Sequence, residues 1–260
     1  MTEGFVSPTR KLLWQAGLLA LIAAFWQFGP AMFDISPLTL PRLSDSLAAA
    51  AGPLTGDGTL VGNALVTLVE VTAAFVIAGV LGIAVGLVIG SIEPVRRVAT
   101  PLLMAAFAVP LMVLIPLFLV GMGLGISSKI AFGAVYAFFP AVFNTVVGVG
   151  SVQETHLSVA RAFGLSRLDT MRKVVVRSAA RNIMNGLQMS ISMAIIAVLS
   201  IEMFGSVAGL GYLIQRAGHR MRIDEVYGLI LVVLVIAIAL LAVVKLLGRA
   251  VNVRLEASID

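Results

Sequence analysis

The sequence contains no cysteine and only two histidines, and its Asp, Glu, Lys and Arg residues make up only 12% of the 260 positions. A soluble domain carries about 25% charged residues. The absence of cysteine excludes disulfides and thiolate metal sites. His156 and His219 each stand alone, without a second ligand at helical spacing. We therefore expect no metal site and no catalytic residue in this chain.

Apolar residues, in contrast, account for 60% of the sequence. A soluble fold of this size has too little interior to cover so much apolar surface, so the composition predicts a polytopic membrane protein. The net charge of +5 does not indicate nucleic-acid binding, because the basic residues lie between apolar segments rather than on one soluble face.

The long intervals without charge predict the membrane spans. A helix needs about 20 mostly apolar residues to cross the hydrocarbon core. Continuous apolar runs without alternation argue against the strands of a β-barrel. We therefore predict an all-α protein with six transmembrane helices, at residues 12–33, 60–90, 101–120, 130–150, 182–201 and 226–244.

The distribution of Lys and Arg predicts the orientation of these spans. With the N-terminus inside, 13 of the 18 Lys and Arg residues fall in cytoplasmic segments, as the positive-inside rule requires. Arg42, Lys129, Arg216, Arg220 and Arg222 fall outside. Both termini are then cytoplasmic, and the first apolar run is a membrane span rather than a cleaved signal peptide.

Two of the predicted spans carry packing signals. Small residues recur every four positions on the second span and predict close approach of another helix; they are Ala74, Ala78, Gly82, Gly86 and Gly90. The third span contains Pro101, Pro110 and Pro116, which we expect to bend it.

A basic segment, residues 154–178, separates the fourth and fifth spans. Gly164 is expected at a break between two short helices, with Ser166 as the N-cap of the second and Asp169 as its capping-box partner. Apolar residues at steps of three and four predict one stripe, formed by Leu157, Ala160, Gly164, Leu168, Met171 and Val175. Such a segment either lies on anionic lipid headgroups or docks onto a cytoplasmic partner.

Three stretches resemble those of a known family. Ser158, Val159 and Ala160, with Gly164 four residues later, resemble the cytoplasmic loop motif of permease subunits of binding-protein-dependent ABC transporters. Ser158 replaces the motif's Glu, and Arg177 stands where its Pro is expected. LLMAAFAVPLMVLIPLFLVGMGLGISSKI and EMFGSVAGLGYLI are similar to the nitrate, sulfonate, taurine and bicarbonate group. The resemblance implies the type I ABC importer permease fold with a cytoplasmic coupling helix.

The same resemblance implies the partners of the chain. A separate ATPase subunit, in two copies, would bind ATP and Mg²⁺ and grip the coupling segment through Ala160, Arg161, Phe163, Gly164, Leu165 and Ser166. The chain itself lacks the GxxxxGK[ST] sequence of an ATPase and holds no cofactor. A second permease copy, in a homodimer, and an extracytoplasmic binding protein would complete an importer of a small anionic solute, such as nitrate, a sulfonate, taurine or bicarbonate, in the bacterial inner membrane.

Several residues are candidates for the transport pathway or its gate, and most of them lie on the third and fifth spans: Met104, Phe107, Met112, Gln188, Met189, Ser192 and Glu202. An ionisable group inside a membrane helix is a functional hypothesis by default. Glu202 belongs to the family-like stretch, and we expect a structural or gating role for it. Glu70, inside the second span, either shares such a role, pairs with an Arg or caps a loop.

Two other classes of protein compete with the importer. A stand-alone channel or secondary carrier would contain intramembrane charge pairs or inverted repeats with broken helices; the spans contain two acids and no clear repeat. A membrane-embedded enzyme would need a convergent set of catalytic side chains, which neither histidine has.

Overall fold

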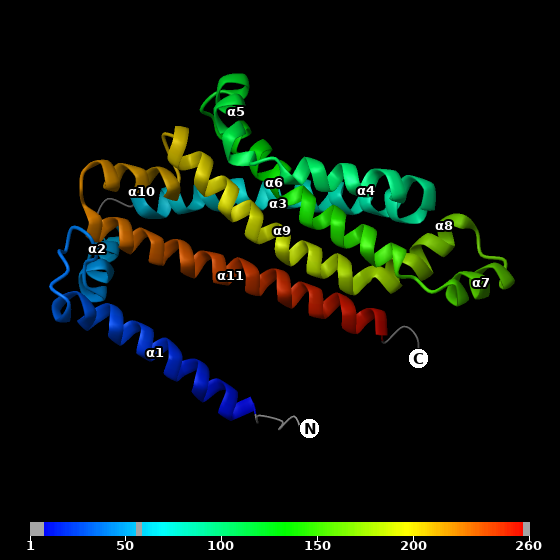
Figure 1. The fold of residues 1–260 in the computed structure, drawn as a ribbon, viewed down its shortest axis with the longest axis horizontal. Coiled ribbons are helices and arrows are strands. Elements are labelled where there is room, and N and C mark those ends of the chain that lie inside the picture. Colours follow the sequence, from blue (N-terminus) through cyan, green and yellow to red (C-terminus); the bar gives the residue numbers. More distant parts are fainter. Residues whose placement is uncertain (1–7, 56–58, 257–260) are drawn as a thin grey trace. The chain divides into compact units, whose positions relative to one another are not determined.

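A computed structural model describes residues 8–55 and 59–256, and all regular structure in these ranges is helical. The first half comprises α1 (Pro8–Met32), α2 (Leu43–Thr55), α3 (Thr59–Ser91), α4 (Glu93–Ala108), the 3₁₀ turn η1 (Leu111–Leu114), α5 (Ile115–Met122) and α6 (Ile126–Gly150). The second comprises α7 (Glu154–Ala162), α8 (Arg167–Thr170), the π-helical turn η2 (Met171–Val175), α9 (Val176–Gly205), α10 (Leu210–His219) and α11 (Ile223–Glu256) (Figure 1).

Within the described residues, five helices are long and apolar enough to cross a membrane. They are α1, α3, α6, the continuous helix Arg167–Gly205 and α11. A sixth span results if α4 and the following Leu111–Met122 are counted as one broken span. The predicted all-α architecture is confirmed.

The chain divides into two compact units, each of which we describe by itself. The first contains the described residues up to Val61 together with Leu213–Val233. In this unit the indole of Trp26 donates to the carbonyl of Pro41 over 3.0 Å and packs edge-on against Tyr227. Gly228 brings α11 against the backbone of α2.

The second unit contains Gly62–Tyr212 and the remainder of α11 from Leu234. Its centre is α6, with α3 and α9 packed along it (Figure 1). One cluster of buried apolar residues comes from these helices and from α11: Val71, Ala74, Ala78, Ala134, Ala137, Ile191, Ala194, Ile195, Val198 and Val244. Small side chains dominate this core because little apolar driving force exists between helices in lipid, and close van der Waals contact takes its place.

The predicted stripe of small residues on α3 packs against α6. A Cβ added at Gly82 would lie 2.5 Å from that of Ala141, and one added at Gly86 would lie 2.5 Å from that of Thr145. Both distances are far below van der Waals contact. The backbones of α3 and α6 could therefore not lie this close together if either glycine carried a side chain. The expected packing face is confirmed, and α6 is its partner.

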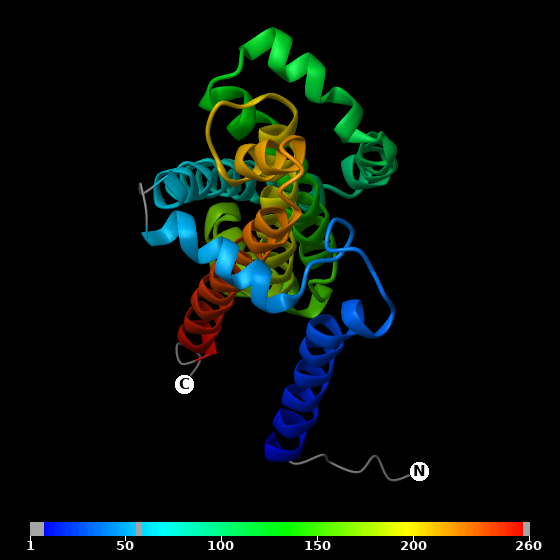
Figure 2. The ribbon, with the colours of Figure 1, turned by 90° about the vertical axis from the view of Figure 1, so that its left-hand side faces the viewer.

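The three prolines of the predicted third span have different effects. Pro101 lies inside α4 without a break, and Pro116 lies in the first turn of α5, where its missing N–H costs nothing. Val109 is extended, with ψ of 129°, as expected before a proline, so the helix stops before Pro110. The flanking helices meet at 70°. Figure 2 views α4 along its axis while η1 and α5 lie across the view.

Candidate coupling and gating sites

The segment between α6 and α9 contains the glycine turn that the sequence predicts. Gly164 has φ of +66°, a left-handed conformation that glycine adopts without strain. The Leu165 N–H donates to the Ala160 carbonyl over 3.1 Å, and the Gly164 N–H donates to that of Arg161 over 3.0 Å. This pair of bonds closes α7 as a Schellman motif. A Cβ at Gly164 would meet nothing within 4 Å, so glycine is required here for conformation rather than for space.

Ser166 begins the helix after this turn. Its hydroxyl accepts from the Asp169 N–H over 3.1 Å and donates to the Asp169 carboxylate over 2.7 Å, which confirms the predicted N-cap. The expectation of two short helices is wrong for the second helix, because α8 continues through η2 into α9. Residues 167–185 contain neither glycine nor proline, and nothing interrupts the helix.

The predicted apolar stripe is only partly correct. Ala160 and Val175 are buried, and Leu157 and Met171 pack beside Val175 against α3 and α6 side chains. Leu168, however, is 60% exposed. The left-handed turn at Gly164 changes the direction of the chain, so the stripe does not run on through Leu168.

Leu168 and two apolar side chains outside the predicted stripe are exposed at the surface of the segment. Phe163 is 81% exposed, Leu168 is 60% exposed and Val159 is 50% exposed. We call these three residues the docking face. Phe163 follows α7 directly, and Leu168 lies in α8. A search for one continuous stripe misses this face, because Phe163 and Leu168 lie on opposite sides of the turn.

The charged residues of the segment are exposed, as predicted. Arg161 pairs with Glu154 at 2.6 Å, and Lys173 pairs with Asp169 at 3.0 Å. Exposed pairs of this kind contribute about 0–1 kcal/mol to stability. They therefore keep the surface soluble and leave the apolar docking face as its distinctive feature.

At the Gly205 end of α9, Glu202 is fully buried and binds the chain that follows the helix. Its Oε2 accepts from the Gly211 N–H over 2.7 Å, and its Oε1 accepts from the Thr67 hydroxyl over 2.7 Å. Thr67 in turn accepts from the Leu210 N–H over 2.8 Å. The carboxylate thus ties α9 to α3 and to the start of α10.

Two further buried ionisable groups lie beside Glu202. Glu70 on α3 is within hydrogen-bonding reach of Glu202, and Lys129 on α6 is close enough to attract both carboxylates. Glu70 is 1% exposed and Lys129 is 3% exposed. The Lys129 ammonium also donates to the carbonyls of Leu124 and Gly125 over 2.5 and 3.0 Å. We call Thr67, Glu70, Lys129 and Glu202 the Glu202 junction.

The junction corrects the expectation that Lys129 lies in an external loop, and it shows which groups surround Glu202. Lys129 is not a loop residue that reports on topology, since it is buried. Glu202 binds the chain that follows its helix rather than pairing with an arginine, and Glu70 lies beside Glu202. Sequence reasoning missed Lys129 and Thr67. The available signal was that Glu70, Lys129 and Glu202 are isolated charges within or beside predicted spans, and isolated charges in lipid seek one another.

The other candidate pathway residues fall into two separate sets. On α4, Met104 is exposed, and Phe107 packs against Phe139 and Phe143 with ring centroids 5.2 and 5.9 Å away. Met112 packs beside Ile115 and Phe132. On α9, Ser192 donates to the carbonyl of Gln188 within its own helix, and Met189 contacts the Asn144 amide at 3.7 Å. Met189 and Asn144 are therefore brought together.

Comparison with known proteins decides the family. The model of the binding-protein-dependent transport system inner membrane component matches residues 62–257, which include both the docking face and the Glu202 junction. The chain belongs to this family. The resemblance seen in the loop motif and in the two flanking stretches is thereby confirmed.

Relatives of the permease include two proteins named for sulfur-containing solutes. It is 29% identical to the taurine transport system permease protein TauC of Escherichia coli over 236 residues, which are 89% of this chain and 86% of TauC. It is 29% identical to the putative aliphatic sulfonates transport permease protein SsuC of Bacillus subtilis over 245 residues, which are 93% of this chain and 88% of SsuC.

A solved structure supports the fold. The permease matches a chain from inward-facing conformations of the MetNI methionine ABC transporter with a TM-score of 0.61 and 19% identity. The match covers 78% of this chain and 98% of that chain. The permease therefore has the type I ABC importer permease fold, and it is a multi-span inner-membrane subunit of a binding-protein-dependent ABC importer. Its family consists of transport components rather than enzymes.

Proposed function

We propose that residues 1–260 act as one permease domain, which pairs with a second copy to enclose the pathway of an ATP-driven importer. Both termini and the segment 154–178 face the cytoplasm in this proposal. Two copies of an ATPase subunit bind ATP and Mg²⁺, and they also bind that segment. A binding protein delivers the solute from the other side of the membrane, and alternating access moves it inward.

The observation that carries this proposal is the docking face. Phe163 stands on a left-handed glycine turn that fixes its direction, and it is 81% exposed. A large apolar side chain held rigidly at a charged surface suits a partner with an apolar groove. A helix lying on lipid headgroups would instead present an apolar stripe along its length, and here Leu157 and Ala160 of that stripe are turned toward the protein.

The docking segment is connected to the transmembrane core in a way that suits transmission of movement. α8, η2 and α9 form one continuous helix from Arg167 to Gly205. A displacement at Leu168 is therefore carried along α9 past Gln188, Met189 and Ser192 to Glu202. We propose that Ala160, Arg161, Gly164, Leu165 and Ser166 shape the docking turn, and that Phe163 inserts into the ATPase.

Glu202 fits the role of a gate anchor better than that of a solute ligand. It is fully buried, and both its oxygens accept hydrogen bonds from the protein itself. A carboxylate is also a poor ligand for an anion. We propose that solute contacts come from the more exposed candidates Met104, Phe107 and Met189, with Met112, Gln188 and Ser192 supporting the helices behind them.

The proposed solute is a small organic sulfonate or a related anion, because TauC and SsuC are named for taurine and aliphatic sulfonates. The test is uptake of labelled taurine by proteoliposomes that contain the permease, its ATPase and its binding protein. We expect uptake that requires ATP. Replacing Phe163 by Ser is expected to abolish ATPase co-purification and uptake, because an apolar anchor becomes polar. The matched control is Val207→Ser, an exposed apolar residue just beyond the other end of α9.

The outcomes separate the parts of the proposal. Normal ATPase association in Phe163→Ser would overturn the docking assignment. Uptake that persists without the ATPase would favour the stand-alone carrier. ATP-dependent uptake of a different solute, with taurine inert, would leave the importer and overturn the sulfonate assignment.

A further inference from the structure

A groove between α4 and α6 combines basic and apolar walls. It has a volume of about 440 Å³. Its lining residues are Arg96, Arg97 and Thr100 on α4 and Val146, Val147, Gly150 and Ser151 at the end of α6. A second cavity of about 560 Å³ also includes Arg96 and extends to Arg161 and Arg167 in the coupling segment. The two hollows share Arg96 and Gly150.

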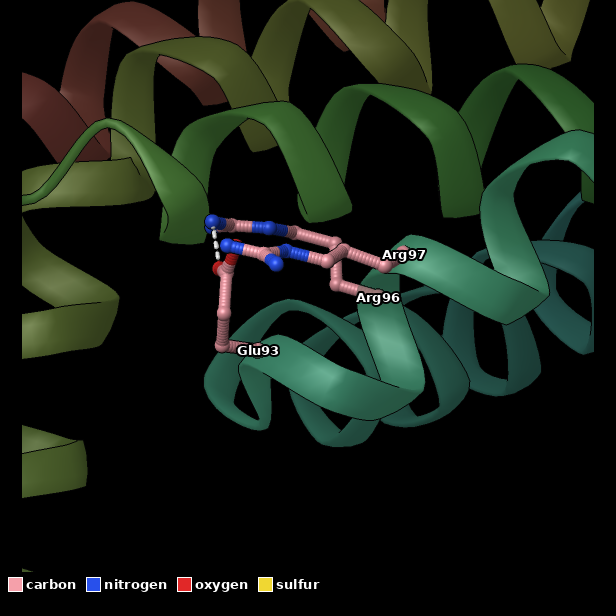
Figure 3. Close-up of polar contacts among 3 residues, drawn as sticks. All are labelled: Glu93, Arg96 and Arg97. Atoms are coloured by element: carbon pink, nitrogen blue, oxygen red, sulfur yellow. Dashed lines mark hydrogen bonds and ion pairs between the residues drawn. The ribbon is translucent and has the colours of Figure 1, made fainter.

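The groove has more positive than negative charge. Arg96 and Arg97 both pair with the single carboxylate of Glu93, and Figure 3 shows their side chains extending in the same direction toward it. In the adjoining cavity Arg161 is paired with Glu154. Within the described part of the chain, no ion pair neutralises Arg167. The four arginines thus face two glutamates, and two positive charges remain for an anion.

Two details suggest that the groove is built for a ligand. A Cβ at Gly150 would collide with the guanidinium of Arg96, so this glycine lets the arginine lie over the end of α6. The Thr100 hydroxyl is buried and has no hydrogen-bond partner among the described residues. A buried hydroxyl without a partner is uncommon, and this one lies in the wall of the groove beside the two arginines.

The rest of the wall is apolar. Val146 forms part of the floor and is buried, whereas Val147 is 62% exposed. A ligand that matches the whole groove has an anionic head and a hydrocarbon tail. Basic pockets between membrane helices on the cytoplasmic side bind anionic lipid headgroups. Here α6 is long and apolar enough to span the membrane, and α4 forms one arm of the bent pair that counts as a sixth span. A free phosphate would satisfy the arginines and leave the valine wall uncovered.

We propose that an anionic phospholipid of the membrane occupies this groove, with its phosphate between Arg96 and Arg97 and one acyl chain along Val147. Because the adjoining cavity reaches Arg161 and Arg167, the headgroup lies next to the coupling segment. The lipid would thereby hold α4 against the elements that receive the ATPase. This site rests on the proposed cytoplasmic placement of these helix ends but not on ATPase docking, so it stands whether or not the docking proposal is correct.

Native mass spectrometry of the purified permease, without its ATPase, tests the proposal. The protein is exchanged into detergent containing phosphatidylglycerol or phosphatidylcholine, and retained lipids are counted. We expect selective retention of phosphatidylglycerol. Each basic residue near a lipid surface contributes about 1 kcal/mol, so the double variant Arg96→Gln/Arg97→Gln is expected to weaken retention about 30-fold. The single variant Arg97→Gln, at a side chain that is 77% exposed, is expected to weaken it about fivefold.

Two further variants serve as controls. Arg181→Gln removes an exposed arginine of α9 that does not line either hollow, and it should leave retention unchanged. Gly150→Ala keeps every charge and displaces the Arg96 guanidinium, so it should reduce retention in a folded protein. Equal retention in wild type and the double variant would overturn the proposal, as would equal losses in Arg181→Gln. Complete displacement by millimolar inorganic phosphate would assign the site to a free anion instead.

Discussion

The two ends of α9 differ in whether the charged side chains near them are buried or exposed. At the Gly205 end, Glu202 is inaccessible to solvent and accepts hydrogen bonds from Thr67 and Gly211. At the Val176 end, the ion pairs Arg161–Glu154 and Lys173–Asp169 are largely exposed. Burying a charge costs several kcal/mol unless partners surround it, whereas exposed pairs contribute little. The first end is therefore built to hold elements together, and the second leaves its surface free for a partner.

The largest expected effect is that of Glu202→Ala. The substitution removes the acceptor for the Thr67 hydroxyl and for the Gly211 N–H, and both donors stay buried. We expect a loss of about 3–5 kcal/mol in the free energy of unfolding, measured by SDS titration in mixed micelles. Glu154→Ala, at the exposed end, should give no measurable change. Equal effects of the two substitutions would contradict the distinction between the ends.

A smaller effect is expected for Lys129→Met. It removes the cation that faces Glu70 and Glu202, and it leaves the carbonyls of Leu124 and Gly125 without their donor. Loss of a buried partner costs about 1–3 kcal/mol. Adding Glu70→Gln should recover part of this loss, because the neutral amide keeps hydrogen-bonding groups beside Glu202 and cannot carry a second negative charge. The same SDS titration on both single variants and the double variant measures the coupling; strictly additive effects would mean that the two side chains do not interact.

The two ends also differ in how far the sequence could predict them. The Gly164 turn and the Ser166 cap were predictable because they are local: one residue sets a left-handed conformation, and the other satisfies an N–H three residues later. The long apolar spans were predictable for a similar reason, since lipid requires all backbone groups to be paired within each helix. The small-residue stripe of α3 also identified a packing face, although not α6 as its partner.

The contents of the Glu202 junction were not predictable in this way. Thr67, Lys129 and Glu202 are far apart in sequence and meet only after α3, α6 and α9 pack. The exposure of Leu168 escaped prediction because a helical stripe assumes one straight helix, and the turn at Gly164 breaks that assumption. The sequence could not say which of the three prolines causes the 70° bend, because only the structure shows that the helix ends before Pro110.

The smallest effect that separates the two ends is expected for Gly164→Ala. Because a Cβ there meets no neighbouring atom, the cost comes only from the left-handed backbone and amounts to about 1 kcal/mol. Hydrogen exchange at the Leu165 amide, which is bonded to Ala160, should speed up about fivefold, while the SDS midpoint falls only slightly. Gly164→Asn should restore most of the protection, because asparagine tolerates this conformation. If alanine instead lowered the SDS midpoint as far as Lys129→Met does, the coupling segment would be part of the stabilising core, and its exposed charges and docking face would no longer mark it as a surface kept free for a partner.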